Sequence, residues 1–416
     1  MGRETTNLSL FLARRMRSST NRKITVSAQI ITIATLAVAI GMVTMLLSIA
    51  FSRGLQSEIH KKMTAFYGDV EVSPFENGDA QYSSIPFRWN EELQALWQEH
   101  PELQNPYPFI KKAGVLKYKT LFEGALFMGV DATYSPQAMM SFPFEGRFLN
   151  FENKNAEIVL SAPLAQRLNL KLGDRFRAYF IDAESSSQYP KSRRLTLVGT
   201  YRSGFPDIDN NLVFTSLDLL QGLNRWESDQ VGGITSALAG QVPPAQVANN
   251  LYEQLPSNLD VHLLQNRFSS LYQWMALFDF NTWIIIAVML LVGIVNIATA
   301  LLVLILERSK MVGLLKALGT PNTTLQQIFL WNGLLVMGRG LLWGNVFGLV
   351  CYFAQKYGAI IRLDPTTYFV EVAPVELHLW DLIGLNSFVI LVSALCLWIP
   401  VKMVSRIAPA QVLKYA

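Results

Sequence analysis

Charged residues are scarce in this chain. Only 16% of its 416 residues are Asp, Glu, Lys or Arg, whereas 51% are hydrophobic. Soluble domains are about a quarter charged, so we expect part of the chain to lie in lipid. The sequence contains no basic run interleaved with aromatic residues, and it therefore gives no indication of nucleic-acid binding.

Cysteine and histidine are also rare. The two cysteines, Cys351 and Cys396, both lie in apolar stretches, and the four histidines have no metal-ligand spacing. Neither the phosphate loop G-x-x-x-x-G-K-[ST] nor the nucleophile motif G-x-S-x-G occurs. We therefore expect a protein that is not an enzyme and has no catalytic residue, metal or cofactor of its own. Any use of ATP and Mg²⁺ would belong to a partner.

Four long stretches contain almost no charge. Residues 24–52 and 282–306 have none, and 325–355 is interrupted only by Arg339. Crossing the hydrocarbon layer takes about 20 apolar residues. We predict four transmembrane helices, at residues 24–52, 282–306, 325–355 and 382–400.

The distribution of Lys and Arg predicts the orientation of these helices. Basic residues gather before the first span, between the second and third, and after the fourth: Arg14, Arg15, Arg17, Arg22, Lys23, Arg308, Lys310, Lys316, Lys402, Arg406 and Lys414. Because such residues favour the cytoplasmic side, both termini are predicted to be cytoplasmic. The predicted cytoplasmic parts are an amphipathic entry helix (1–23), a segment at 307–324 and a tail (401–416). The predicted outer parts are 53–281 and the loop 356–381.

The region 53–281 is predicted to be a large α+β domain. Alternating runs indicate strands at 69–73, 127–130, 176–181 and 195–199, and helical patterns occur at 90–100, 162–168 and 243–255. A β-rich part at about 140–240 is interpreted as an insertion. The first span is expected to extend outward to about residue 67, and an unbroken helix is expected from about residue 265 into the second span.

The segment 307–324 has the pattern of a short amphipathic helix. Met311, Leu314, Leu315 and Leu318 fall on one helical face, and Gly319 with Pro321 stops the helix. Two interpretations are open. The helix is either an anchor at the membrane surface or a coupling helix that fits a groove on a cytoplasmic motor.

These residues also carry a family resemblance. The pattern E-x-x-x-x-[VI]-x-x-L-[KR]-x-[LM]-G-x-[TP], from Glu307 to Pro321, resembles the permeases of type VII ABC transporters. That class includes the macrolide-exporter, FtsX and lipoprotein-releasing LolC/LolE groups. The resemblance extends to residues 10–17, 158–161, 173–174, 198–201 and 408–413. Two segments, 189–195 and 363–377, are similar to the lipoprotein-releasing branch, with the closer likeness to LolE.

The resemblance implies a function in the bacterial inner membrane. An ATPase dimer would pull on two permease subunits, the same or related chains, through Glu307, Met311, Leu314, Leu315, Leu318 and Gly319. The outer domains would then squeeze a lipoprotein out of the lipid. A periplasmic lipoprotein carrier is a further implied partner, although the hairpin at 183–194 is shorter than that of LolC. The alternatives are a drug or peptide exporter and an FtsX-like regulator of a cell-wall hydrolase.

Two sets of residues within the spans have open interpretations. A flexible apolar stripe either contacts acyl chains or packs within the bundle: Val38, Met42, Met45, Leu46 and Ile49, with Phe278 and Trp283 at the outer interface. Arg339 is unusual near the middle of a span, where a charge is costly and normally faces the bundle interior or a cavity. We expect a structural partner such as Asn296 or Asn345, with substrate contact as the alternative.

Overall fold

A computed structural model of the chain describes residues 26–77, 82–140, 142–152, 156–180, 190–239 and 242–402. The chain divides into two compact units. One comprises residues 1–57, 274–362 and 372–416, and the other comprises 58–273 and 363–371. The predicted entry helix at 1–23, nearly all of the tail at 401–416 and most of the hairpin at 183–194 lie outside the described residues.

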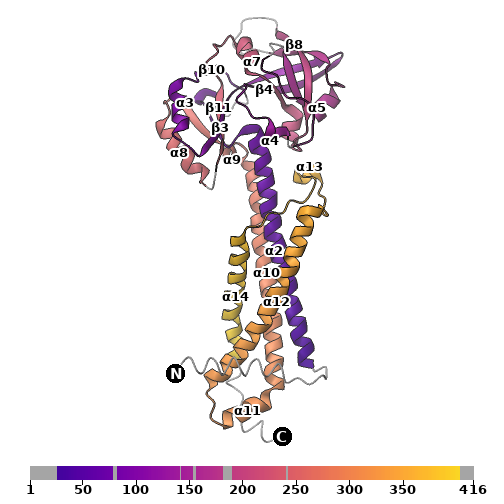
Figure 1. Cartoon of the computed structure of the whole chain (residues 1–416), viewed down its shortest axis with the longest axis vertical. Helices are drawn as coiled ribbons and strands as arrows, with labels where there is room; N and C mark the ends of the chain where they lie inside the picture. The colour runs from indigo at the N-terminus through magenta and orange to yellow at the C-terminus, as the bar shows by residue number, and fades with distance from the viewer. Residues whose placement is uncertain are drawn as a thin grey trace. The chain divides into compact units, whose positions relative to one another are not determined.

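The first unit, hereafter the membrane unit, is built on a bundle of four helices (Figure 1). They are α2 (Val26–Tyr67), α10 (Ser269–Glu307), α12 (Asn322–Gly358) and α14 (Leu379–Lys402). Each is long and apolar enough to cross a membrane, so the predicted class of four-span protein is confirmed. The hydroxyls of Thr35, Thr44 and Thr299 donate to the carbonyl four residues earlier in their own helices, which satisfies them without water.

Glycines in α12 let it pack tightly against α2. A Cβ placed at Gly344 would lie 2.5 Å from the Met42 Cβ, and one at Gly340 would lie 2.7 Å from the Val38 Cβ. Small residues of this kind allow helix backbones to approach closely where lipid provides no hydrophobic driving force. The position of α12 in the bundle therefore depends on these glycines.

The second unit, hereafter the outer unit, contains a ten-stranded mixed sheet. Its strands are β1 (Val70–Pro74), β3 (Leu103–Tyr118), β4 (Leu121–Val130), β5 (Phe144–Gly146), β6 (Glu157–Ser161), β7 (Arg175–Phe180), β8 (Lys191–Tyr201), β9 (Leu212–Ser216), β11 (Gly233–Leu238) and β12 (Leu259–Leu263). A separate pair is formed by β2 (Phe87–Arg88) and β10 (Gln230–Val231).

The long strand β3 belongs to two parts of this sheet. Its first half pairs with β11, which continues through β1 to β12. Its second half pairs with both β4 and β7, and the chain of pairings β3–β4–β9–β6–β8–β7 returns to β3. Six strands therefore close into a ring. Large side chains fill it, among them Phe127 and Phe180, whose ring centroids are 4.7 Å apart.

The outer unit also contains short helices, several of which pack against the sheet (Figure 1). They are α3 (Glu91–Gln98), α4 (Gln137–Met140), α5 (Ala162–Arg167), α6 (Pro206–Asn211), α7 (Leu217–Asn224), α8 (Pro244–Gln254), α9 (Leu264–Arg267) and α13 (Pro365–Tyr368). Their starts follow the local sequence: the Asn90 side chain accepts from the Leu93 N–H and the Ser161 hydroxyl from the Leu164 N–H. The predicted α+β class is thus confirmed.

Three details differ from the sequence-based expectations. The strand β3 was not predicted, because Pro106 and Pro108 argue against a central strand; the structure accommodates them where Asn105 has φ 49° and the register with β11 shifts. The ring of strands also takes in β4 and half of β3, so it begins before residue 140. Finally, Phe268 separates α9 from α10, so the helix expected from residue 265 is interrupted.

Candidate functional site

The segment after α10 forms a separate short helix, α11 (Ser309–Ala317), in the membrane unit. Arg308 breaks the long helix with φ −95° and ψ 12°. Gly319, at φ 87°, ends α11, and the Thr320 N–H donates to the Leu315 carbonyl, as in a Schellman motif. The glycine supplies the left-handed conformation that this ending requires.

The four apolar residues predicted to form one docking face do not share one environment. Leu314 and Leu318 are 54% and 75% exposed. Met311 is half-buried, and Leu315 packs against the core of the bundle. Glu307, just before the helix, is exposed. The surface that α11 leaves open to a partner is therefore centred on Leu314 and Leu318.

The apolar stripe of α2 that was interpreted as an acyl-chain surface lies mostly inside the bundle. Val38, Met42, Met45 and Leu46 are all buried, and Ile49 packs beside them. Within a single chain these residues pack inside the bundle, which favours the packing interpretation, and their contact with acyl chains stays a prediction. The exposed face of α2 instead carries Ile33, Leu36 and Ile40.

The two aromatic residues at the outer end of α10 differ from each other. Phe278 makes edge contacts with Phe51 and Trp274, at centroid distances of 6.3 and 4.9 Å. Trp283 is 62% exposed, with the ring of Phe388 at 6.4 Å. Trp283 is therefore the one of the pair that remains open to lipid, substrate or a second subunit.

Arg339 is exposed and does not pair with Asn345, which corrects the expected structural pairing. The Asn345 amide instead exchanges hydrogen bonds of 2.8 and 3.1 Å with Asn386 of α14. Within the described residues, Arg339 has no hydrogen bond or ion pair with Asn296 or with any other side chain. It lines a groove of about 520 Å³ between α2 and α12, beside Thr35 and Trp343.

A polar network closes the outer end of the bundle. Asp279 of α10 accepts hydrogen bonds from the Ser52 hydroxyl and the Gln56 amide of α2, at 3.0 and 2.9 Å. Arg53 forms an ion pair of 2.8 Å with Asp381 at the start of α14. These charges lie just beyond the predicted spans, and the network ties α2 to both α10 and α14.

The loop between α12 and α14 is ordered by Gln355, a buried residue near the end of α12. Its amide donates to the carbonyls of Ile361 and Ala373, and its oxygen accepts from the Ile361 N–H. Residues 363–371 belong to the outer unit. There the Phe369 ring stacks on Phe205 with centroids 4.8 Å apart, and the Phe369 carbonyl accepts from Lys62 at 2.9 Å.

The sequence reasoning missed a buried group of charges in the outer unit. Glu71 of β1 is within 2.7 Å of both Lys111 of β3 and Arg267 of α9. The signal in the sequence was faint: Glu71 and Lys111 each interrupt an apolar strand pattern with a charge. Among the residues that the structure describes, no cluster of three His, Cys, Asp or Glu side chains is arranged to hold a metal ion.

Comparison with known proteins identifies the class. The family of MacB-like periplasmic core domains matches residues 31–253, more than half of the chain, and the FtsX-like permease C-terminal family matches residues 283–409. The chain therefore belongs to the MacB-like and FtsX-like permeases, the type VII class of ABC transporters. The FtsX-like and lipoprotein-releasing permeases of this class lie in the inner membrane and are not ATPases themselves. They are subunits of ABC transporters, which implies an ATPase and a second permease subunit as partners.

Within this class, the chain is similar to the lipoprotein-releasing LolE and LolC proteins, which confirms the resemblance seen in the sequence. It is 22% identical over 389 residues to the lipoprotein-releasing system transmembrane protein LolE of Haemophilus influenzae, covering 90% of this chain and 92% of that one. It is 21% identical over 393 residues to LolC of Neisseria meningitidis, covering 91% and 92%. The crystal structure of the periplasmic region of MacB from Actinobacillus actinomycetemcomitans is similar at 13% identity and a TM-score of 0.35, over 49% of this chain and 92% of that one.

Proposed function

We propose that this chain is a permease subunit that extracts lipoproteins from the inner membrane, driven by a separate ATPase. The observation that carries the proposal is the similarity to lipoprotein-releasing LolE and LolC over nine-tenths of the chain. The segment 363–377, which resembles the same branch in sequence, supports it. ATP and Mg²⁺ would be held by the ATPase, and a second permease, the same or a related chain, would complete the transporter.

The exposed face of α11 supports the proposed docking of the ATPase. Leu314 on α11 and Leu318 at the C-terminal cap of the helix are large, exposed apolar side chains, and the opposite side of the helix, at Val312 and Gly313, is buried. An amphipathic helix that presents leucines in this way fits an apolar groove on a partner. Because α11 directly follows α10, a force on α11 would act on a rigid helix of 39 residues.

The exposed apolar surface of the bundle supports a lipid-linked cargo. Ile33 on α2, and Trp283 and Val288 on α10, are each about half exposed or more. Acyl chains and a second permease subunit are both apolar enough to cover such surfaces. We propose that the cargo's acyl chains pass along these exposed faces rather than along the buried stripe of α2.

The test is a change of Leu314 to Asp. If the side chain docks in an apolar groove, the carboxylate would be buried without a partner, which costs several kcal/mol and lowers the affinity by orders of magnitude. We expect Leu314→Asp to lose the ATPase on co-purification and to stop lipoprotein release from spheroplasts. Because Leu314 is exposed in the chain, the permease itself should still fold.

Two matched variants sharpen this test. Leu314→Met keeps the apolar contact and should retain both the ATPase and release. Leu314→Lys distinguishes docking from simple membrane anchoring. A helix that is only anchored should tolerate the change, because the lysine can extend its charge to the headgroups. A helix docked in an apolar groove should not. Retention of the ATPase and of full release by Leu314→Asp would show that α11 is not a coupling helix.

Export of a drug or peptide is the second candidate, favoured by the match of residues 31–253 to MacB-like periplasmic domains. It predicts that loss of the chain makes cells more sensitive to exported compounds while lipoprotein release continues. An FtsX-like regulator would instead alter cell-wall hydrolysis. Measuring release, compound sensitivity and hydrolase activity in one deletion strain separates the three.

A further inference from the structure

The groove between α2 and α12 has a polar end and an apolar end. Arg339 and Thr35 lie at one end of the groove, and Val43 and Phe347 lie further along the same two helices, at the other end. Packing fixes how the two helices are aligned along the groove. A Cβ at Gly340 would lie 3.0 Å from the Thr35 carbonyl oxygen, and a Cβ at Gly344 would lie 2.9 Å from the Ala39 carbonyl oxygen. The two helices therefore run parallel, with Arg339 at the level of Thr35.

Arg339 is directed toward the cytoplasmic end of the groove. Side chains on a helix tilt toward its N-terminus, and α12 begins at Asn322, within the predicted cytoplasmic segment 307–324. Thr35 stands 18 residues before Arg53, which pairs with Asp381 at the outer end of the bundle. That is about 27 Å along the axis, close to the cytoplasmic side of a hydrocarbon layer about 30 Å thick. A long side chain that extends from there toward the interface can meet a headgroup drawn slightly inward.

A charged side chain within a membrane span, such as that of Arg339, normally has a partner. Within the described residues Arg339 has no partner, and none of the four predicted spans contains an Asp or Glu anywhere in the sequence. A second copy of this chain would therefore bring no carboxylate to this level of the membrane. The Thr35 hydroxyl donates to the Ile31 carbonyl, so the guanidinium is the principal donor in the groove.

We infer that this groove binds an anionic phospholipid of the cytoplasmic leaflet, whose phosphate contacts Arg339 and whose acyl chain lies along Ile40, Val43 and Phe347. The volume of about 520 Å³ is in the range of small-ligand sites, and a guanidinium matches a phosphate in charge and geometry. The order of the groove, polar toward the cytoplasm and apolar toward the membrane centre, is that of a lipid in this leaflet. The inference goes beyond the cargo, because it holds whatever substance the permease carries.

The experiment measures lipid binding to the purified full-length chain by native mass spectrometry. Dioleoyl phosphatidylglycerol and dioleoyl phosphatidylcholine, which share acyl chains and differ in net charge, are titrated separately. Both lipids carry a phosphate, but in phosphatidylcholine the choline cation offsets its charge near the guanidinium. We therefore expect the native chain to prefer the anionic lipid by about tenfold, which corresponds to about 1.4 kcal/mol. Arg339→Leu should abolish the preference and Arg339→Lys should keep part of it.

Two further variants locate the binding. Ile40→Trp would fill the groove without changing its charge and should weaken binding of the anionic lipid. Leu342→Ala changes an exposed α12 residue that does not line the groove and should bind as the native chain does. Equal binding of both lipids by the native chain, or an unchanged preference in Arg339→Leu, overturns the inference. The inference is also overturned if Arg339→Leu changes the protein from a dimer to a monomer while the lipid preference stays the same, because the groove would then be a subunit interface.

Discussion

At the scale of single residues, Lys111 is the most enclosed charge that the structure describes in the outer unit. Its side chain is 3% exposed, and its Nζ lies 2.7 Å from a Glu71 oxygen and 4.2 Å from the centroid of the Phe109 ring. Burial lowers the pKa of Lys111 to about 8, against the opposing effect of Glu71. Burial acts to raise the pKa of Glu71, but Lys111 and Arg267 together hold it below its usual value.

Removing the carboxylate from this group should be strongly destabilising. Glu71→Gln leaves Lys111 and Arg267 close together with no counter-charge, and breaking a buried ion pair costs about 3–5 kcal/mol. We expect lower resistance to urea and faster hydrogen exchange in β1 and β3 of the full-length protein. Lys111→Met is the matched control, because it replaces the cation with an apolar chain and leaves the Arg267–Glu71 pair in place.

The same variant predicts a change in pH dependence. Because the pKa of Glu71 is lower in the folded protein, its stabilising effect is present above its ordinary pKa and is lost as the pH falls through the folded value. Glu71→Gln should therefore lose less stability than the native chain between neutral pH and about pH 3. An identical acid dependence in both proteins would contradict the assigned role of Glu71.

At the scale of elements, α2 touches the segment before α14 at a glycine. A Cβ at Gly54 would lie 2.4 Å from the Pro374 carbonyl oxygen and 2.7 Å from the Val375 Cα. The neighbouring Glu376 N–H donates to the Ala50 carbonyl at 2.9 Å. The close approach is therefore backbone against backbone, and a larger residue at position 54 must displace one of the two.

Two glycines of α2 should consequently respond in opposite ways to the same substitution. Gly54→Ala should lower the melting temperature of the purified protein and open the 372–377 segment to proteolysis, with a loss of about 1–3 kcal/mol. Gly41→Ala is the control, since its Cβ would lie at ordinary contact distance, 3.6 Å, from the Met289 carbonyl. There the gain in helix propensity, up to about 1 kcal/mol, should dominate. Equal effects at the two positions would show that the contact at Gly54 is not limiting.

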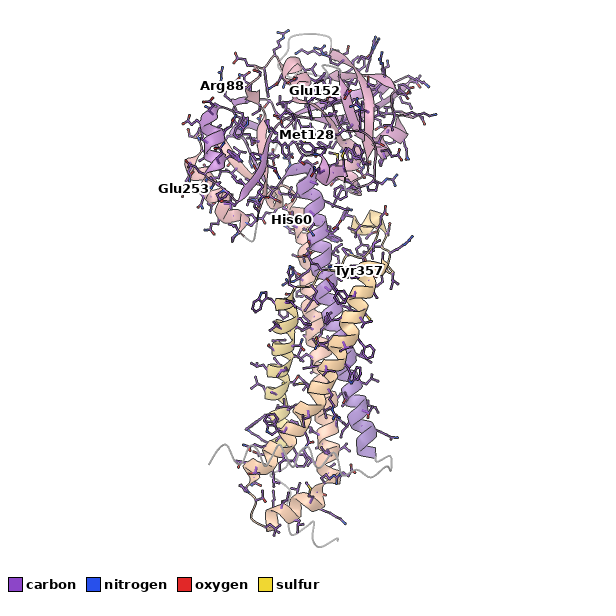
Figure 2. All side chains as sticks on the ribbon, viewed as in Figure 1. His60, Arg88, Met128, Glu152, Glu253 and Tyr357 are labelled. Carbon is purple, nitrogen blue, oxygen red and sulfur yellow. The ribbon has the colours of Figure 1, made fainter. Side chains whose placement is uncertain are left out.

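At the scale of the whole molecule, the orientation in the membrane rests on the basic residues near the spans. They predict that the outer unit lies on one side and α11 on the other. Glu253 in α8 (Figure 2) and Lys310 in α11 are both exposed, so a reagent can reach them. Labelling at these two positions therefore reports which side of the membrane each of them faces.

Cysteine labelling tests this orientation. In a background with Cys351→Ala and Cys396→Ala, a membrane-impermeant maleimide should label Glu253→Cys in intact spheroplasts. Lys310→Cys should react only after the membrane is permeabilised. Labelling of Lys310→Cys, but not of Glu253→Cys, in intact spheroplasts would reverse the predicted topology.

Several features of the candidate site were readable in the sequence. The stop of α11 at Gly319 follows from glycine's freedom at positive φ, and the unusual charge of Arg339 follows from its position in an apolar stretch. The partners of these residues were not readable. Asn345 pairs with Asn386 of α14, a contact between segments that are separate in sequence, and no local pattern distinguishes this pairing from one with Arg339.

By itself, the sequence determined that the chain has four membrane-spanning helices and a large α+β domain between the first and the second, because span length and strand or helix periodicity are local properties. Only the tertiary structure decided that Val38, Met42 and Leu46 face inward while Leu36 and Ile40 face outward. The reason is that a helix apolar on every side has no polar face to mark its orientation. That choice is made instead by glycines 340, 344 and 348 of α12, against which only one face of α2 can pack closely.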